Sequence, residues 1–255
     1  MKIIRNESDF CVTDFIINKK YNYDEFTRND DPTGRTYNVG DHKVPSVTTI
    51  LSKTQSQEKR EALNLWRQRV GYDQASRITN QAAVRGTEMH YILEQYCKGV
   101  GYINLSPEGS LPRMMAHKIV DNLDKFSQVY GTEVTLNYEN LWAGSSDLIG
   151  VYDNLPTVID FKQSNKPKKD EWIEDYKYQI AAYSLAHKKN FGPIKQGLIC
   201  VCTKDLLFQG FKMTDADIAE YETKWFARVD EYYKKRGYEI NQIPLSPFRL
   251  QRQFI

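Results

Sequence analysis

The 255-residue sequence predicts a mixed α/β fold of the α+β type, with helices flanking a central mixed sheet and a helical region in front of it. Apolar residues recur at three- and four-residue steps over about 57–98, which is the period of a helix. Three segments rich in strand-forming Val, Ile, Leu, Tyr and Thr follow at 132–140, 143–152 and 157–163. A second helical pattern then precedes another strand pair. This order favours a mixed sheet covered by helices.

The elements before the long helical pattern are short. Residues 34–45 combine turn residues with strand-forming residues, which is typical of a hairpin. Ser46 is a favourable N-cap for a short helix at 47–51. Gly71 and Gly86 interrupt the helical pattern that follows, so we expect two or three helices there.

The rest of the chain is expected to continue as helix, three strands, helix, strand pair and helix. A turn at 153–156 joins the second and third strands. The other elements are expected at 112–128, 170–190, 194–203 with 206–213, and 215–235, before an irregular tail at 241–255. We expect one domain over 1–255, made of a β/turn segment with a short helix (1–56), a helical region (57–130) and a sheet core with a C-terminal helix (131–255).

Composition and charge exclude several classes of protein. Hydrophobic residues make up 40% of the chain and charged residues 27%, which argues against a disordered chain or a coiled coil. The 35 basic and 33 acidic residues give a net charge of +2, so a nucleic-acid surface has to come from local clustering. No segment approaches the roughly 18 apolar residues of a membrane helix, and the N-terminus lacks the apolar core of a signal peptide. We expect an intracellular protein without membrane contact.

Three charged residues, Asp147, Asp160 and Lys162, lie in strands that are otherwise apolar. With the turn centred between Asn154 and Leu155, Asp147 would lie opposite Lys162. Residues that pair across strands, or that lie two apart on one strand, share a face of the sheet. The three side chains are therefore expected to project together.

Such a group is typical of metal-assisted phosphodiester hydrolysis. Two neighbouring carboxylates repel each other unless a cation lies between them, and Mg²⁺ or Mn²⁺ is the usual one. Lys162 would stabilise negative charge that develops on a phosphate oxygen. A strand-end Asp and an exposed Asp–Lys pair explain the same residues without any activity, and these three residues alone favour neither interpretation.

Two helical segments add candidate residues. His90 lies one turn after Gly86, on the same helical face, and an imidazole is a common metal ligand. Tyr176, Gln179 and Tyr183 also share one helical face. The alternatives are a structural histidine and an aromatic stripe that packs on the sheet.

Taken in order, these motifs resemble the RecB-like branch of the PD-(D/E)XK nucleases. The resemblance covers about 100 residues, and 45–51 resembles the N-terminal segment of such proteins more weakly. Its motifs are Gly86-x-x-x-His90, Glu133, Gly144-x-x-Asp147, Asp160-Phe161-Lys162 and Gln179-x-x-x-Tyr183. The resemblance implies a restriction-endonuclease-like core and a metal-dependent DNA exonuclease of the PD-(D/E)XK type.

The resemblance also implies a role for each matching residue. Asp147 and Asp160 would be metal ligands, joined by the backbone carbonyl of Phe161. His90 would be a further ligand, which favours Mn²⁺ as well as Mg²⁺ because imidazole is softer than carboxylate. Lys162 would be the catalytic lysine. The remaining roles are a place beside the metal for Glu133, and orientation of the lysine or DNA contact for Gln179 and Tyr183.

No other cofactor is expected. Some relatives hold an iron–sulfur cluster with one early and three late cysteines, and the spacing here does not match that arrangement. Cys200 and Cys202 share a face of a predicted strand and are expected to be core thiols. The four cysteines are Cys11, Cys97, Cys200 and Cys202. No GxxxxGK[ST] loop occurs, so we expect no bound nucleotide.

DNA, as a single strand or at strand ends, is the expected partner. Basic residues that follow phosphates, with aromatic residues that stack on bases, are typical of a single-strand channel. The candidates are Lys166, Lys168 and Lys169 in the loop after the lysine strand, Trp172, Tyr176 and Tyr183 beyond it, and Arg85 in the helical region, which could arch over a strand end. The alternative is that these residues only form solvent-exposed helix faces and a charged surface loop that keeps the protein soluble.

Three hypotheses remain open. The leading one is an exonuclease, and the others are a structure-specific or restriction-type endonuclease with the same site and a non-catalytic nucleic-acid-binding module. A compact nuclease of this kind would suit a phage, where it would act in repair or recombination inside the host cell.

Overall fold

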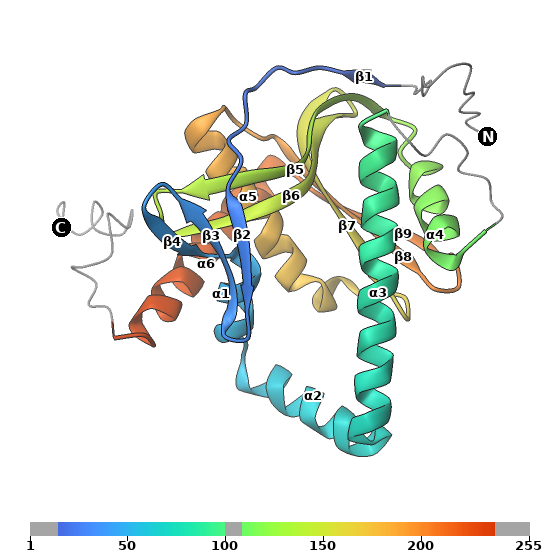
Figure 1. Cartoon of the computed structure of the whole chain (residues 1–255). Helices are drawn as coiled ribbons and strands as arrows, with labels where there is room; N and C mark the ends of the chain where they lie inside the picture. The colour runs from blue at the N-terminus through green and yellow to red at the C-terminus, as the bar shows by residue number, and fades with distance from the viewer. Residues whose placement is uncertain (1–14, 100–108, 238–255) are drawn as a thin grey trace.

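A six-stranded mixed sheet lies at the centre of the computed structural model, which describes residues 15–99 and 109–237 (Figure 1). The strand order is β1-β5-β6-β7-β8-β9, with β1 parallel to β5, β7 parallel to β8, and the other neighbours antiparallel. The predicted mixed sheet with flanking helices is thus confirmed. The strands are β1 (Ile16–Ile17), β5 (Phe126–Tyr138), β6 (Trp142–Tyr152), β7 (Leu155–Ser164), β8 (Gln196–Thr203) and β9 (Phe208–Met213).

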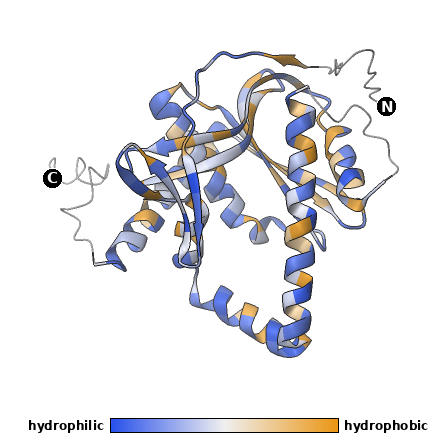
Figure 2. Ribbon diagram, viewed as in Figure 1, coloured by the Kyte–Doolittle hydropathy of each residue, from blue (hydrophilic) through white to orange (hydrophobic). Residues whose placement is uncertain are grey.

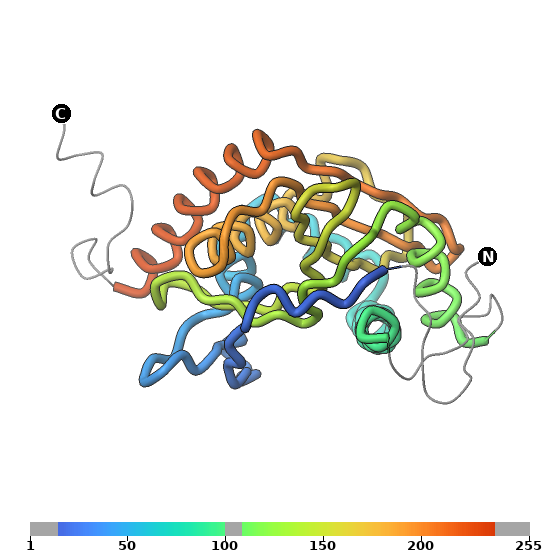
Figure 3. Tube along the Cα trace, turned by 90° about the horizontal axis from the view of Figure 1, so that it is seen from above, coloured from blue at the N-terminus to red at the C-terminus, as the bar shows by residue number. Residues whose placement is uncertain are grey.

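Helices cover both faces of this sheet (Figures 1 and 3). Neighbouring residues of a strand point to opposite faces of the sheet, so each strand contributes side chains to two hydrophobic cores. Ile149 and Val158 pack in the core under α5 and α6, whereas Leu148 and Ile159 pack in the core under α3 and α4. The helices are α1 (Val47–Lys53), α3 (Tyr72–Cys97), α4 (Leu111–Val120), α5 (Glu174–Asn190) and α6 (Asp215–Lys234).

A second, three-stranded sheet lies beside the first and consists of β2 (Thr27–Asp31), β3 (Gly34–Val39) and β4 (His42–Pro45). The predicted hairpin at 34–45 is confirmed, and β2 adds a strand to it. Ser46 caps α1 as predicted, since its Oγ accepts a hydrogen bond from the Thr49 amide at 3.0 Å. A parallel bridge from Ser46 to Ala143 joins the small sheet to β6.

The long helical pattern forms two helices, α2 (Gln57–Val70) and α3. Gly71, with a φ of 90°, separates them, whereas Gly86 lies inside α3 without breaking it. Helix α2 buries no side chain, is largely hydrophilic (Figure 2), and projects away from the sheet together with the first half of α3 (Figure 1). Among the described residues, no helix has both the length and the apolar character that crossing a bilayer requires.

The predicted C-terminal end of the helix at 112–128 is wrong. Helix α4 ends at Val120, and the Asn122 side chain then donates to the Lys118 carbonyl at 2.8 Å. Strand β5 already begins at Phe126, so the helical region predicted at 57–130 is several residues too long. Tertiary pairing of β5 with β6 outweighs the local helical spacing of the apolar residues.

The remaining predicted elements are found near their expected places. A 3-10 turn (Asp170–Trp172) precedes α5, so the helix itself begins at Glu174 rather than at 170. Cys200 and Cys202 are buried core thiols, as predicted, and Cys97 is buried as well. Cys11 and the tail at 241–255 lie outside the described residues.

Candidate functional site

The candidate site lies where β6 and β7 separate. Their pairing runs from Tyr152–Leu155 at the turn to Leu148–Ile159 and stops there, while each strand continues to pair with its other neighbour. The residues just beyond the last pair are Asp147 on β6 and Asp160 on β7. Two acidic side chains therefore meet at an opening in the sheet.

The register of this hairpin differs from the predicted one. Asp153 and Asn154 both adopt left-handed φ values, 52° and 65°, and form a two-residue turn, which matches the twist of the strands. The register places Asp147 opposite Asp160, not opposite Lys162 as predicted. The error amounts to two residues on the partner strand, and two residues are one full strand period. Asp147, Asp160 and Lys162 therefore still share one face.

Asp147 has two partners on different elements. Its Oδ2 accepts a hydrogen bond from the main-chain N–H of Phe161 at 2.6 Å, which ties β6 to β7 beyond their last pair. Its Oδ1 lies 3.4 Å from Nδ1 of His90 on α3. The carboxylate is 13% exposed, so these contacts fix a nearly buried anion.

Glu133 reaches the same place from β5. It lies between the pairs Thr132–Leu148 and Val134–Ser146, which sets it opposite Asp147. Its backbone has a φ of 48°, a left-handed conformation that is unfavourable for a side chain other than glycine or asparagine. Ser145 Oγ donates to Glu133 Oε2 at 2.7 Å and orients the carboxylate.

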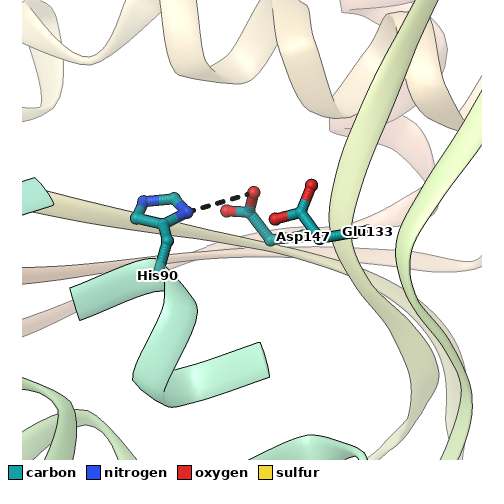
Figure 4. A group of neighbouring side chains, drawn as sticks. All are labelled: His90, Glu133 and Asp147. Atoms are coloured by element: carbon teal, nitrogen blue, oxygen red, sulfur yellow. Dashed lines mark ion pairs between the residues drawn. The ribbon is translucent and has the colours of Figure 1, made fainter. Parts of the chain in front are cut away.

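His90, Glu133 and Asp147 point toward one another from α3, β5 and β6 (Figure 4). Each offers a ligand atom, and these atoms lie within 4.8 Å of one another. Imidazole nitrogen and carboxylate oxygen are ligands that suit Mn²⁺, and carboxylates suit Mg²⁺. The donor set therefore fits a divalent cation.

Asp160 and Lys162 form a close pair beside this cluster. The Lys162 Nζ lies 2.6 Å from Oδ1 and 2.5 Å from Oδ2 of Asp160, whose side chain is only 4% exposed. The ring of Tyr176 lies 5.2 Å from the same Nζ, within cation–π range. Tyr176 is thus the aromatic neighbour of the lysine.

The pKa values follow from burial and from these neighbours. Burial raises the pKa of Asp160 to about 6, and the Asp147 charge acts in the same direction, against the effect of Lys162. Burial also opposes ionisation of Asp147, but His90 and Lys162 outweigh it and lower the pKa. Burial alone would lower the pKa of Lys162, yet Asp160 and Asp147 raise it. The pair thus favours a charged lysine.

The outer donors are also shifted. Burial would lower the pKa of His90, but Asp147 raises it above its usual value. Removal of water and the charge of Asp147 both raise the pKa of Glu133, although its hydrogen bond from Ser145 acts in the opposite direction. The carboxylates of the cluster therefore repel each other, which favours binding of a cation.

The charged side chains of the site line one cavity of about 560 Å³, and these are His90, Glu133, Asp147, Asp160 and Lys162. Gln179 and Tyr183 of α5 line it too, whereas Tyr176, which shares their helical face, does not. Tyr183 packs against Gly144, where an added Cβ would come within 2.7 Å of the ring. This close approach explains why a glycine precedes Asp147 by three residues.

The cavity also has polar residues that the sequence did not identify. Glu94 lies one turn after His90 on α3, and this helical spacing could have indicated it. Thr48 lies within the short segment at 45–51. Arg28 comes from β2, whose polar sequence was not recognised as a strand, and Arg35 comes from β3, in the predicted hairpin, whose place beside the cavity the sequence did not indicate.

Some of the residues predicted to bind DNA lie at the cavity, and others lie outside its lining. Tyr183 lines the cavity and Tyr176 contacts Lys162. The loop residues Lys166, Lys168 and Lys169, with Trp172, are outside the cavity lining. Trp172 is 56% exposed, and Lys169 Nζ lies 5.2 Å from the centre of its indole.

Arg85 joins α3 to the end of β7. Its Nε and Nη2 donate to Gln163 Oε1 at 3.0 and 2.7 Å, and Nη2 donates to Asn165 Oδ1 at 2.5 Å. Gly86, beside it, lets the helix approach the Gln163 side chain closely. Arg85 thereby fixes the position of the helix that carries His90.

Comparisons with known proteins identify relatives. The human protein mitochondrial genome maintenance exonuclease 1 is 29% identical over 213 residues, covering 79% of this chain and 61% of that protein. The Xenopus tropicalis protein of the same name is 30% identical over 208 residues, covering 76% and 58%. The chain thus spans about three fifths of the length of these relatives. No family model matches the chain.

Similarity to solved structures is weaker. The crystal structure of SSO0001 aligns over 74% of this chain and 78% of that chain, with a TM-score of 0.38 and 18% sequence identity. A score this low supports no conclusion about activity. The sequence similarity is the informative comparison: the chain is homologous to proteins named mitochondrial genome maintenance exonuclease 1, and this homology supports the RecB-like nuclease relationship that the ordered motifs predict.

Proposed function

We propose that this chain is a metal-dependent DNA exonuclease of the PD-(D/E)XK type that acts on single strands or strand ends. One observation carries the proposal: the donor atoms of His90, Glu133 and Asp147 lie within 4.8 Å of one another, in the cavity that Asp160 and Lys162 also line. The relatives are named exonucleases, and that name supports both the activity and DNA as the substrate.

We assign the site residues to two groups, one that would bind the metal ion and one that would act on the phosphate. His90, Glu133 and Asp147, with Asp160 and the Phe161 carbonyl, would hold Mg²⁺ or Mn²⁺. Such an ion supplies a Lewis acid for the phosphate and a bound water of lowered pKa. The hydrogen bond from the Phe161 amide holds the Asp147 carboxylate in place, so little reorganisation is needed when the substrate binds.

Lys162 would act on the phosphate. Asp160 keeps the amine charged and positioned, and Tyr176 covers one side of it. A fixed ammonium beside the scissile phosphate stabilises the negative charge that grows in the transition state. Gln179 and Tyr183 line the same cavity and would contact the strand or orient the lysine. The exposed loop with Lys166, Lys168, Lys169 and Trp172, and Arg85 at its base, would meet the strand farther from the bond that is cut.

The test is digestion with Mn²⁺ of linear and circular single-stranded DNA of the same sequence, with linear duplex as a third substrate. The proposal expects the linear strand to be degraded and the circle to stay intact, with no digestion in EDTA. Opening of the circle would show an endonuclease instead. DNA binding with no digestion of any substrate would show a non-catalytic binding module.

Asp160→Asn and Lys162→Met keep the size of each side chain and supply the matched inactive variants. Lys195→Met, which removes an exposed ion pair with Asp215, is the control for losing a lysine elsewhere. Digestion by the two site variants at the rate of the control would contradict the proposed site.

A further inference from the structure

The small sheet carries two arginines into the candidate site. In the β2–β3 ladder Asp30 pairs with Arg35 and Arg28 pairs with Tyr37, so the charged residues share one face. Both Arg28 and Arg35 line the cavity that holds Asp147 and Lys162. This face therefore adds positive charge on the side of the cavity formed by the small sheet.

One carboxylate orients both guanidinium groups. Asp30 Oδ1 accepts from Arg35 Nε at 2.7 Å, and Asp30 Oδ2 accepts from Arg28 Nε at 2.7 Å. The three residues keep a net charge of +1. Because Asp30 binds Arg35 through Nε, the two terminal nitrogens of Arg35 stay available to an anion.

The backbone around Arg35 is fixed to the sheet that carries the acidic cluster. The Arg35 carbonyl accepts from the Ser46 amide at 3.0 Å and from Thr49 Oγ1 at 2.9 Å. Ser46 in turn bridges to Ala143 at the start of β6, the strand of Asp147. Arg35 is therefore held at a set place relative to Asp147, as a group that positions a substrate must be.

A second cavity adjoins the first at Arg35. Arg35 and Thr48 also line a neighbouring cavity of about 300 Å³, whose other walls include Thr33, Ser52 and Lys53. The side chain of Arg35 is 36% exposed and that of Arg28 is 52% exposed, so a ligand can reach both. Asp30 and Asp31 line the neighbouring cavity as well, so Arg35, which borders both cavities, is the arginine placed to meet a phosphate between them.

We propose that Arg35, supported by Arg28 and Asp30, binds the internal phosphodiester of the substrate strand that adjoins the one being cleaved. A guanidinium offers two parallel N–H donors to a phosphate and fixes its position as well as its charge. The inference rests on the proposed function, since the strand must enter the cavity for this contact to form. Arg35 is a positioning residue in this proposal and takes no part in the chemistry.

The test combines Arg35→Gln with single methylphosphonate linkages, which remove the charge of one chosen phosphate. Short linear strands carry the neutral linkage at successive positions, and cleavage is measured with Mn²⁺. The cleavage rate of wild type should fall about tenfold or more when the neutral linkage replaces the phosphodiester that Arg35 binds, as expected when a hydrogen bond between charged groups is lost. The Arg35→Gln variant should cleave the unmodified strand more slowly by a similar factor. Placing the neutral linkage at that one position should not lower its rate further.

Lys43→Gln is the matched control. It removes the Lys43–Asp31 ion pair from the same small sheet, and Lys43 is outside the lining of the larger cavity. It should cleave like wild type. Thermal unfolding of both variants separates a loss of contact from a loss of fold. The proposed contact would be overturned if the neutral linkage lowered the cleavage rate of Arg35→Gln equally at every position. It would also be overturned if Arg35→Gln cleaved the unmodified strand as fast as wild type.

Two further arms make the outcome specific. Strands with and without a terminal phosphate are compared, and a defect of Arg35→Gln confined to the phosphorylated ends would overturn the internal phosphodiester as ligand. Binding of the same strands is also measured by fluorescence anisotropy in EDTA on an Asp160→Asn background. If wild type cleaves nothing, the proposed function fails, while the methylphosphonate effect on binding still decides whether Arg35 holds a phosphate.

Discussion

Asp147 joins β6 to β7 at the point where the two strands stop pairing, because its carboxylate accepts a 2.6 Å hydrogen bond from the main-chain N–H of Phe161. The same carboxylate faces His90 at 3.4 Å. One side chain therefore supports the fold at the opening of the sheet and supplies a donor to the candidate metal cluster. These two roles can be separated by mutation.

Asp147→Asn keeps an oxygen that can accept from Phe161 but removes the negative charge. We expect its free energy of unfolding to stay close to that of wild type and its Mn²⁺-dependent cleavage to be lost. Asp147→Ala removes the acceptor as well and should lose a further 1–3 kcal/mol or so, the cost of an unpaired buried amide. Urea unfolding and digestion of linear strands measure the two effects. Full activity of the Asn variant would contradict the ligand role.

Lys162→Met should lower the rate of cleavage by about 100-fold or more, the usual effect of removing a group that stabilises transition-state charge. Metal binding should persist, because His90, Glu133 and Asp147 are unchanged. Single-turnover digestion and titration calorimetry with Mn²⁺ separate the two. Loss of metal binding with the rate, or an unchanged rate, would show that Lys162 does not act on the phosphate.

His187 predicts how stability depends on pH. It is buried, its Nδ1 donates to the Gly192 carbonyl at 2.7 Å, and its Nε2 accepts from the Tyr23 hydroxyl at 3.1 Å. Burial lowers the pKa of His187 below its ordinary value, so the folded protein keeps the ring neutral. The unfolded chain takes up a proton near pH 6.5. The contribution of His187 is therefore complete above about pH 6.5 and declines as the pH falls below it.

We expect wild type to lose about 1 kcal/mol more than His187→Gln between pH 7.5 and pH 5.5, as one proton bound by the unfolded chain implies. Urea unfolding at the two pH values measures the slope for each protein, and the other groups that titrate in this range cancel in the comparison. Equal slopes would contradict a neutral buried ring.

Gly144→Ala tests the packing behind the cavity. An added Cβ would lie 2.7 Å from the ring of Tyr183, so the ring must shift at a cost of about 1–3 kcal/mol. Cleavage should fall because Tyr183 lines the site. Tyr183→Ala in the same chain should recover part of the stability that Gly144→Ala loses, relative to the sum of the two single changes. Strict additivity in thermal unfolding would show that the two residues do not meet.

The fold class and the shared face of the charged residues could be predicted because both depend on short-range periodicity. The predicted register of the β6–β7 hairpin was wrong, yet Asp147, Asp160 and Lys162 stayed on one face since the error was one full strand period. Asp153-Asn154, two residues that tolerate left-handed φ, could have located the turn correctly.

Other features depend on tertiary structure and left no local signal. The left-handed φ of Glu133 occurs opposite Asp147, between the regular pairs Thr132–Leu148 and Val134–Ser146. Arg28 could not be foreseen, because β2 (Thr27–Asp31) has no apolar alternation, and Arg35 was missed because the packing of the predicted hairpin beside the cavity depends on tertiary structure. The helical spacing that continues past Val120 was overridden when β5 paired with β6.

The most direct measurement of the central claim is anomalous scattering from crystals of the protein soaked in Mn²⁺. The account predicts a manganese peak within ligand distance of His90 Nδ1 or Nε2, a Glu133 oxygen and an Asp147 oxygen, and loss of that peak in Asp147→Asn crystals. Absence of a peak at these three side chains, from protein that digests linear DNA under the same conditions, would contradict it.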